Sequence, residues 1–163
     1  EVFEIDLSEI RPIVAKPHFV DNVVPAEECS GIRIDEAFLG SCNNGRIEDL
    51  RVGAELLRGK KVADSVRFLV VPASRAVYEE ALREGLLKIF MDAGAIVMNP
   101  NCSVCWGSCQ GVIGEGETLI STGTRNFKGR SGHKDSYVYL PSAATVTASA
   151  VKGEICTAES LTK

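Results

Sequence analysis

The chain has 163 residues and a formal net charge of −4, with 45% hydrophobic and 25% charged residues. These proportions exclude a disordered or collagen-like chain, and the mild acidity argues against a nucleic-acid-binding protein. The length predicts one domain with a core large enough to fold without disulfides, and apolar runs such as 68–73 are too short to cross a membrane.

Residues 1–31 predict an extended lead-in segment rather than a compact unit. Pro12, Pro17 and Pro25 interrupt any long helix, and the apolar residues between them come in short clumps. We expect this segment to lie over the surface of a domain that spans residues 32–153. The remaining residues, 154–163, predict a C-terminal tail with a frayed end.

Strand and helix signals alternate within residues 32–153. Short apolar runs predict strands at 37–39, 66–71, 95–98, 117–122 and 137–140. Helical periodicity and capping residues predict helices at 46–58, 74–83, 86–93 and 142–152. Because the strands are continuously apolar and separated by helices, we predict an α/β fold with a mainly parallel sheet and right-handed crossovers.

Three loops with chemically informative residues follow predicted strands. They cover residues 40–46, 99–109 and 121–130. In an open parallel sheet, ligands bind beyond the carboxyl ends of the strands. We therefore expect these loops to meet at one edge of the sheet.

Six cysteines stand at positions 29, 42, 102, 105, 109 and 156, and a chain of this size does not need them as disulfides. Cys102 and Cys105 form a C-x2-C pair, which fits zinc, iron–sulfur and dithiol redox sites alike. With Cys42, two loops would supply three thiolates, which around a [4Fe–4S] cube leave one iron open. Alternatively, Cys42 is a buried small hydrophobic residue.

The loop at 121–130 carries Arg125 and Arg130, separated by Lys128. Guanidinium groups pair bidentately with carboxylates, so two of them on one edge suit a small polycarboxylate. Glycines at 123, 129 and 132 would let the backbone approach a ligand closely. Without the cysteines, a solvated basic turn is the favoured interpretation.

Several other residues receive a weaker interpretation. Asn43 to Gly45 predict a tight turn whose N–H groups face an anion or cluster sulfide, although Asn-Gly is also a common turn pair. Trp106 either shields the site from water or packs in the core. We interpret His18 and His133 as surface or structural histidines. Cys29, Cys109 and Cys156 are interpreted as cysteines outside the site.

The ordered motifs of the three loops resemble the aconitase family, and within it the third domain of the large subunits of 3-isopropylmalate dehydratase and homoaconitase. They read Gly40-Ser-Cys-Asn-Asn-Gly-Arg-Ile-Glu-Asp-Leu50, Asn99-Pro-Asn-Cys-Ser-Val-Cys105 and Arg125-Asn-Phe-Lys-Gly-Arg130. Segments such as 3–7, 15–18, 21–23 and 148–153 agree, so the resemblance covers nearly the whole chain. It implies a three-layer α/β/α domain.

The resemblance also implies that Cys42, Cys102 and Cys105 ligate a [4Fe–4S] cluster whose open iron binds a substrate hydroxyl and carboxylate. Arg125 and Arg130 match the substrate-carboxylate arginines of the family. Enzymes of this family dehydrate a hydroxy di- or tricarboxylic acid and rehydrate the alkene. Thr124 stands where the family often has Asn, which is a departure at a presumed site position.

The same resemblance places the catalytic serine base in a swivelling domain or small subunit, and further Asp and His residues in two other domains. We therefore expect 3-isopropylmalate- or homoaconitate-type chemistry, with no turnover by these residues alone. The crowded cysteines separately predict a reducing compartment, the cytoplasm. The chain begins at Glu1 rather than Met, so it is either a processed product or a piece of a longer chain. A thiol–disulfide redox module and a zinc-binding scaffold are the alternative functions.

Overall fold

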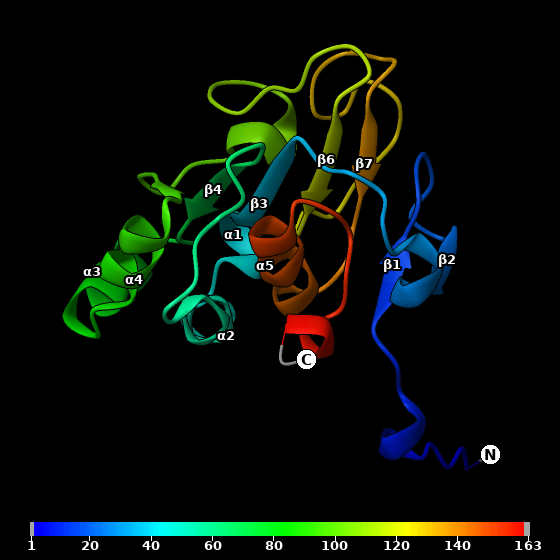
Figure 1. Cartoon of the computed structure of the whole chain (residues 1–163), viewed down its shortest axis with the longest axis horizontal. Helices are drawn as coiled ribbons and strands as arrows, with labels where there is room; N and C mark the ends of the chain where they lie inside the picture. Colours follow the sequence, from blue (N-terminus) through cyan, green and yellow to red (C-terminus); the bar gives the residue numbers. More distant parts are fainter. Residues whose placement is uncertain (1, 162–163) are drawn as a thin grey trace.

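A computed structural model of the chain describes residues 2–161, and a five-stranded parallel sheet lies at its centre (Figure 1). The strands are β3 (Glu36–Gly40), β4 (Arg67–Val71), β5 (Ile96–Val97), β6 (Thr118–Ser121) and β7 (Tyr137–Tyr139). Their order in the sheet is β5-β4-β3-β6-β7, and each neighbouring pair is parallel. The predicted α/β fold with a mainly parallel sheet is confirmed.

The strand order reverses at β3. The chain adds β4 and β5 on one side of β3 and then returns to add β6 and β7 on the other side. Such a reversal leaves a crevice at the carboxyl ends of the two strands on either side of it, here β3 and β6. The topology therefore marks the edge where β3 and β6 end as the place for a ligand.

Three helices cover one face of the sheet: α2 (Ile47–Leu57), α4 (Leu86–Ala93) and α5 (Ala143–Lys152). The shorter helix α3 (Arg75–Arg83) packs against α4 and α2 and begins at Ser74, whose hydroxyl accepts from the Val77 amide. Phe68 and Phe90 meet edge to face in this layer, with ring centroids 6.3 Å apart. The predicted helices agree with these bounds because their capping residues are local in the sequence.

Residues 98–117 cover the opposite face and form the third layer. Met98, Val104 and Ile113 of this segment pack against Phe38 and Leu119 of the sheet. The segment contains a 3₁₀ helix, η3 (Ser103–Trp106), but no α-helix. Apolar anchors rather than helix packing therefore hold the segment that carries the C-x2-C pair.

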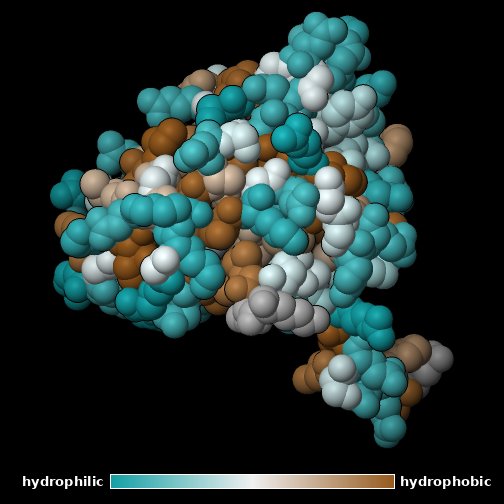
Figure 2. Space-filling view, viewed as in Figure 1, coloured by the Kyte–Doolittle hydropathy of each residue, from teal (hydrophilic) through white to brown (hydrophobic). Residues whose placement is uncertain are grey.

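The lead-in segment folds back on itself before the domain begins. Its elements are η1 (Leu7–Glu9), β1 (Ile13–Ala15), β2 (Val23–Pro25) and η2 (Ala26–Cys29), with β1 and β2 antiparallel. Ala15 exchanges two 3.0 Å backbone hydrogen bonds with Leu140, so the hairpin lies beside the end of β7. Val14 is fully buried. Residues preceding β1 extend away from the domain (Figures 1 and 2).

The C-terminal tail is anchored through its first residues. The backbone of Glu154 forms an isolated antiparallel β-bridge with Arg33, and Ile155 is fully buried. The Cys156 amide donates to the Ser149 hydroxyl over 3.1 Å. A 3₁₀ helix, η4 (Ala158–Leu161), follows, and Thr162 and Lys163, expected to be frayed, lie outside the described residues. None of the helices in residues 2–161 has the length and apolar character needed to cross a membrane.

Candidate functional site

The turn that carries Cys42 begins where β3 ends, as the one-turn helix α1 (Ser41–Asn44). A Cβ atom at Gly40 would lie 2.2 Å from the carbonyl oxygen of Val71, and one at Gly45 would lie 2.4 Å from the same oxygen. The turn therefore lies against the end of β4 at two positions where only glycine fits. The tight turn expected at 43–45 is part of a single helical turn instead, because the Gly45 amide donates to the Ser41 carbonyl over 3.0 Å.

Thr122 joins the Cys42 turn to the end of β6. The Gly40 amide donates to the Thr122 hydroxyl over 2.9 Å, and the Asn44 side-chain amide donates to the Thr122 carbonyl. The Asn44 side chain thus helps to fix the turn, and the expected role of the 43–45 backbone N–H groups toward an anion or cluster sulfide stays a prediction. These bonds hold the ends of β3 and β6, the two strands on either side of the crevice, in register.

Cys105 lies at the same edge, although its loop starts at the distant strand β5. Residues 98–105 cross the second face of the sheet, and Val104 is completely buried there. The Sγ atom of Cys105 is 3.6 Å from where a Cβ of Gly123 would stand, in the loop that follows β6. The crossing of the chain, rather than strand adjacency, brings the C-x2-C pair toward the crevice.

Arg130 is tied directly to the Cys105 loop. Its Nε atom donates to the Cys105 carbonyl over 2.8 Å, and its guanidinium lies 5.6 Å from the centroid of the Phe127 ring. A Cβ at Gly107 would lie 2.1 Å from the Arg130 carbonyl oxygen, so the two loops touch through their backbones. Arg125 is exposed, and its Nη1 atom donates to the Thr124 carbonyl over 2.7 Å.

The glycines of the arginine loop serve different purposes. Gly123 lies beside the Cys105 thiol, so its expected role of letting a ligand approach the backbone stays a prediction. A Cβ at Gly132, in contrast, would lie 2.2 Å from the Ile113 carbonyl oxygen, so this glycine allows contact between two backbones. The expectation that Gly132 admits a ligand is therefore replaced by a structural role.

Asn126 connects the lead-in hairpin to the site, and sequence reasoning missed it. Its side-chain amide donates to the carbonyls of Lys16 and Phe19 over 2.8 and 3.3 Å, while its buried Oδ1 atom has no hydrogen-bond partner within residues 2–161. A hollow of about 150 Å³ lies at this contact. Its lining consists of His18, Phe19, Val20, Arg125, Asn126 and Phe127.

The thiols divide into two groups. Cys42, Cys102 and Cys109 are exposed and Cys105 is half-buried, whereas Cys29 and Cys156 are buried, and burial raises the pKa of the Cys29 thiol. All six are free. The burial of Cys29 and Cys156 agrees with their interpretation as cysteines outside the site. The exposure of Cys42 excludes the alternative that it is a buried small hydrophobic residue.

Cys42, Cys102 and Cys105 suit an iron–sulfur cluster by donor chemistry, because all three are free thiols, the first two exposed and the third half-buried. Within residues 2–161 no three Cys, His, Asp or Glu side chains form a group able to hold a single metal ion, and a cluster, whose cysteines each bind a different iron, needs a wider spacing than that. The ligand set thus stays a prediction. Trp106 is 62% exposed, which excludes its alternative core role and leaves the shielding role as a prediction.

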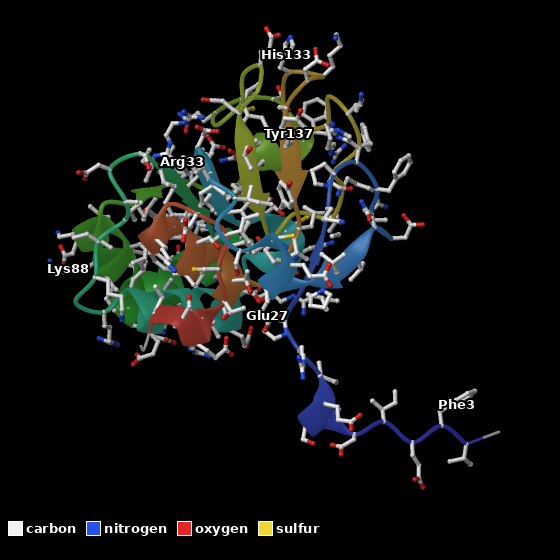
Figure 3. All side chains as sticks on the ribbon, turned by 45° about the vertical axis from the view of Figure 1, so that its right-hand side comes forward. Phe3, Glu27, Arg33, Lys88, His133 and Tyr137 are labelled. Carbon is white, nitrogen blue, oxygen red and sulfur yellow. The ribbon has the colours of Figure 1, made fainter. Side chains whose placement is uncertain are left out.

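The histidines lie at the margins of this region. His18 stacks on Tyr137 with ring centroids 5.9 Å apart, and Figure 3 shows His133 on a loop at the far end of the molecule from the α-helices. The Nδ1 atom of His133 is 3.9 Å from an Asp135 oxygen. Both histidines therefore have structural neighbours in keeping with the sequence interpretation.

A charged cluster lies at the opposite, amino-terminal edge of the sheet, where sequence reasoning predicted nothing. The buried Glu36 accepts from Arg67 Nε over 3.0 Å, and Arg67 also donates twice to Glu117. Burial raises the pKa of Glu36 to about 7, against the opposing effect of Arg67. The Arg67 hydrogen bonds lower the pKa of Glu117. This cluster joins three strands and is structural.

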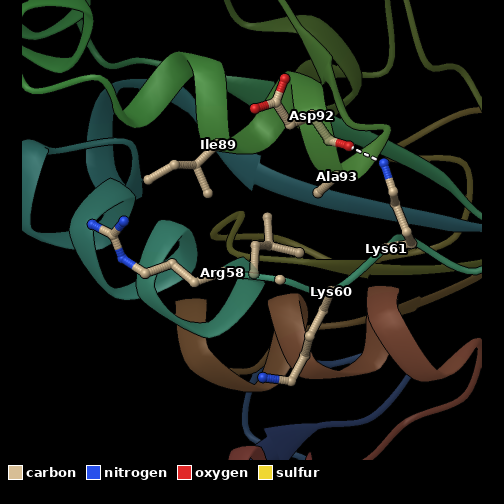
Figure 4. Close-up of a pocket in the computed structure, with 8 residues that line it drawn as sticks. Arg58, Lys60, Lys61, Ile89, Asp92 and Ala93 are labelled. Atoms are coloured by element: carbon tan, nitrogen blue, oxygen red, sulfur yellow. Dashed lines mark hydrogen bonds between the residues drawn. The ribbon is translucent and has the colours of Figure 1, made fainter.

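A second hollow, of about 410 Å³, lies between the carboxyl ends of α2 and α4 (Figure 4). Arg58, Lys60 and Lys61 surround it, and Lys61 Nζ donates to the Asp92 carbonyl. Helices that follow parallel strands run back toward the strands' amino ends. This hollow is therefore at the other edge of the sheet from the cysteine loops.

Comparison with known proteins gives a consistent result. A model of the aconitase family (aconitate hydratase) matches residues 1–153. The chain is 56% identical over 154 residues to a protein of Methanothermobacter thermautotrophicus named as a probable 3-isopropylmalate dehydratase large subunit, covering 94% of this chain and 37% of that relative. A relative from Methanopyrus kandleri, named 3-isopropylmalate dehydratase large subunit 1, is 53% identical, and the match covers 93% of this chain and 36% of the relative. A relative from Aquifex aeolicus, named 3-isopropylmalate dehydratase large subunit, is 50% identical, and the match covers 99% of this chain and 39% of the relative. The chain thus spans well under half the length of these relatives.

Proposed function

The chain belongs to the aconitase family, and from this membership we propose that it is the [4Fe–4S]-binding part of the large subunit of an isomerising hydro-lyase. The observation that carries the proposal is the meeting of the Cys42 turn, the Cys105 loop and the Arg130 side chain at the crevice between β3 and β6. The names of the relatives favour 3-isopropylmalate as the type of substrate.

Cys42, Cys102 and Cys105 would hold the cluster. When bound, the cluster supplies a Lewis-acidic iron that binds a substrate hydroxyl and carboxylate. Each cysteine of such a cluster binds a different iron, so the thiols would hold it from the turn after β3 and from the loop over the second face of the sheet. The close packing of Gly40 and Gly45 against Val71 and of Gly107 against Arg130 fixes the backbones of both loops.

Arg125 and Arg130 would bind the substrate carboxylates. Arg130 is held by the Cys105 carbonyl through Nε and by Phe127 through its guanidinium face, so its terminal nitrogens are oriented before substrate arrives. Arg125 is exposed and free to turn toward a second carboxylate. Because the Arg130 side chain is held in place and the Arg125 side chain is exposed, we expect Arg130 to position the substrate relative to the cluster. Arg125 would neutralise the negative charge of a substrate carboxylate.

Other parts of the enzyme would complete the reaction. The chain spans 37% of the Methanothermobacter thermautotrophicus relative, so the other large-subunit domains lie outside it. The relatives are named as large subunits, which supports a small subunit as partner of this chain. We propose that this partner carries the serine base. The proposal places the complex in the cytoplasm and assigns no nucleic-acid or membrane partner.

The decisive experiment is anaerobic cluster reconstitution of the full-length large subunit. We expect about four iron and four sulfide per chain with broad visible absorbance. Cys42→Ser, Cys102→Ser and Cys105→Ser should each lose this absorbance, whereas Cys109→Ser, a change at an exposed thiol of the same loop, should retain it. A colourless protein that binds zinc, or one that reduces disulfides through Cys102 and Cys105 without metal, would overturn the proposal.

A further inference from the structure

Residues 2–7 have the side-chain pattern of a β-strand but no sheet to join. Phe3, Ile5 and Leu7 alternate with the polar Glu4 and Asp6, which is the period of a strand with one buried face. The three apolar side chains are 79%, 73% and 77% exposed. Figure 3 shows Phe3 at the end of a segment that reaches well away from the domain.

The backbone of this segment is also unpaired. Within residues 2–161, no hydrogen bond joins the backbone of residues 2–5 to another part of the chain. Backbone pairing begins at η1, where the Asp6 and Leu7 carbonyls accept from Glu9 and Ile10 and the Asp6 side chain accepts from the amide and hydroxyl of Ser8. A strand that continues through Leu7 therefore has to open this single 3₁₀ turn. A segment with exposed apolar residues and free backbone groups is a template for strand addition.

The attachment of the segment limits where a partner can lie. β1 begins at Ile13 and is fixed to the end of β7 through Ala15 and Leu140, so residues 2–7 are tethered close to that edge of the domain. Asp6, Glu9 and Arg11 make the connection polar, whereas the next apolar side chains, Ile10 and Ile13, are again exposed. Exposed apolar side chains thus recur from the segment to the start of β1, with polar residues between them.

We propose that residues 2–7 form an edge strand of a β-sheet in the part of the large subunit that lies outside this chain, with Phe3, Ile5 and Leu7 facing the core of that part. The proposal rests on the proposed function, because the curated relatives extend well beyond the matched region: this chain covers 37% of one and 39% of another. That extra length supplies the occupant, and a covalent tether makes pairing effectively intramolecular.

Hydrogen exchange on the full-length large subunit tests the proposal. Because an edge strand pairs on one side only, every second amide of residues 2–7 should exchange at least about tenfold more slowly in the isolated large subunit than unstructured amides do. Exchange at the unprotected rate would overturn the proposal. Protection that appears only on raising the protein concentration, or only on adding the small subunit, would also overturn it by assigning the strand to a second copy or to the other subunit.

Two charge substitutions separate the faces of the strand. Ile5→Lys places a charge on the apolar face and should abolish the protection, whereas Glu4→Lys, on the polar face, should leave it. Equal effects of the two substitutions would contradict the proposed facing. Iron and sulfide content is the parallel readout: both variants should keep the wild-type values, and a wild-type protein without iron would contradict the cluster proposal independently of the exchange result.

Discussion

At the scale of single residues, Glu36 shows how a buried charge is tolerated without being fully satisfied. Its side chain has no exposed surface, and one carboxylate oxygen accepts from Arg67 while the other, Oε1, has no hydrogen-bond partner within the described residues. Gly111 leaves this oxygen space, since a Cβ there would stand 3.1 Å from it. The unpaired oxygen explains why desolvation outweighs Arg67 and raises the pKa to about 7.

A pH-dependent stability difference follows for Glu36→Gln. The pKa of this carboxyl rises from 4.5 in the unfolded chain to about 7 in the fold, so between these values the folded protein binds more protons. Its contribution to the free energy of unfolding is therefore fully present below pH 4.5 and is lost as the pH rises through about 7. The variant should therefore be more stable than wild type by roughly 3 kcal/mol at pH 8, and equally stable near pH 4.

Urea unfolding of both proteins between pH 4 and pH 8 measures this difference. Glu117 has the opposite sign, because its lowered pKa gives a contribution that is lost as the pH falls below its ordinary range. Because Glu117 shares Arg67 with Glu36, the assignment to Glu36 is taken from the change between pH 5 and pH 8, where Glu117 stays ionised in both proteins. A stability difference that stays constant across the range would contradict the assignment to Glu36.

The two arginines of the site should respond differently to substitution by Lys. Arg130→Lys removes the Nε bond to the Cys105 carbonyl and the contact with Phe127, so we expect both faster cluster loss and a KM for substrate raised at least about tenfold. Arg125→Lys keeps the positive charge and should leave both KM and cluster retention close to the wild-type values. Iron content over time and steady-state kinetics of the assembled enzyme separate the two, and parallel behaviour of both variants would be inconsistent with this division of roles.

Site residues differ in how far the sequence reveals them. Cys102, Cys105 and the arginine pair are visible because each motif is short and chemically distinctive. Asn126 and Glu36 were not identified, since their partners Lys16 and Arg67 are 110 and 31 residues away and nothing local signals the contact. Residues fixed by long-range polar contacts carry no local pattern that sequence reasoning can use.

At the scale of elements, the helical turn α1 is defined by the two glycines on either side of it. Gly40 has φ 151° and Gly45 has φ −113°, and a Cβ at either would collide with the Val71 carbonyl oxygen. The turn is also linked to Thr122 at the end of β6. Cys42 is therefore positioned by contacts to both strands that neighbour β3, one on each side.

Gly40→Ala should destabilise the domain by more than about 3 kcal/mol and displace Cys42. The matched control is Gly59→Ala, at another positive φ of 69° but with no atom within 4 Å of the new Cβ, where we expect a cost of only about 1–2 kcal/mol. Guanidinium unfolding midpoints give both values. Equal losses would mean that backbone conformation, rather than the collision with Val71, decides the effect.

The elements themselves were largely predictable. Helix 86–93 matches α4 in both bounds, and Ser74 caps α3 as expected, because periodicity and caps are local signals. The β1–β2 hairpin was not predicted: its strands are three residues each and contain or adjoin prolines, and the pairing of Ala15 with Leu140 is a long-range event. The α-helix-free third layer was likewise hidden, because residues 98–117 have no periodicity.

At the scale of the whole molecule, the Cys42 turn, Cys105 and Arg130 come together where β3 and β6 end. Under the proposed function this edge supplies one side of an active site, and the acid–base residues come from the other domains and the small subunit. We therefore predict that the isolated 163 residues bind the cluster without dehydrating or rehydrating a hydroxy acid, while adding the remaining large-subunit domains and the small subunit restores turnover. Alkene formation followed by ultraviolet absorbance is the measurement, and activity of the chain alone would refute the prediction.

The closed core has a consequence for maturation. Both clusters of buried side chains consist of apolar residues, and η3 is anchored by the fully buried Val104. Small metallodomains that fold only around their metal lack such a core. Under the proposed function, we therefore expect the apoprotein to fold without its cluster and to receive a preassembled one through its accessible thiols. A cluster destroyed by oxidation would then be replaced without new synthesis of the chain.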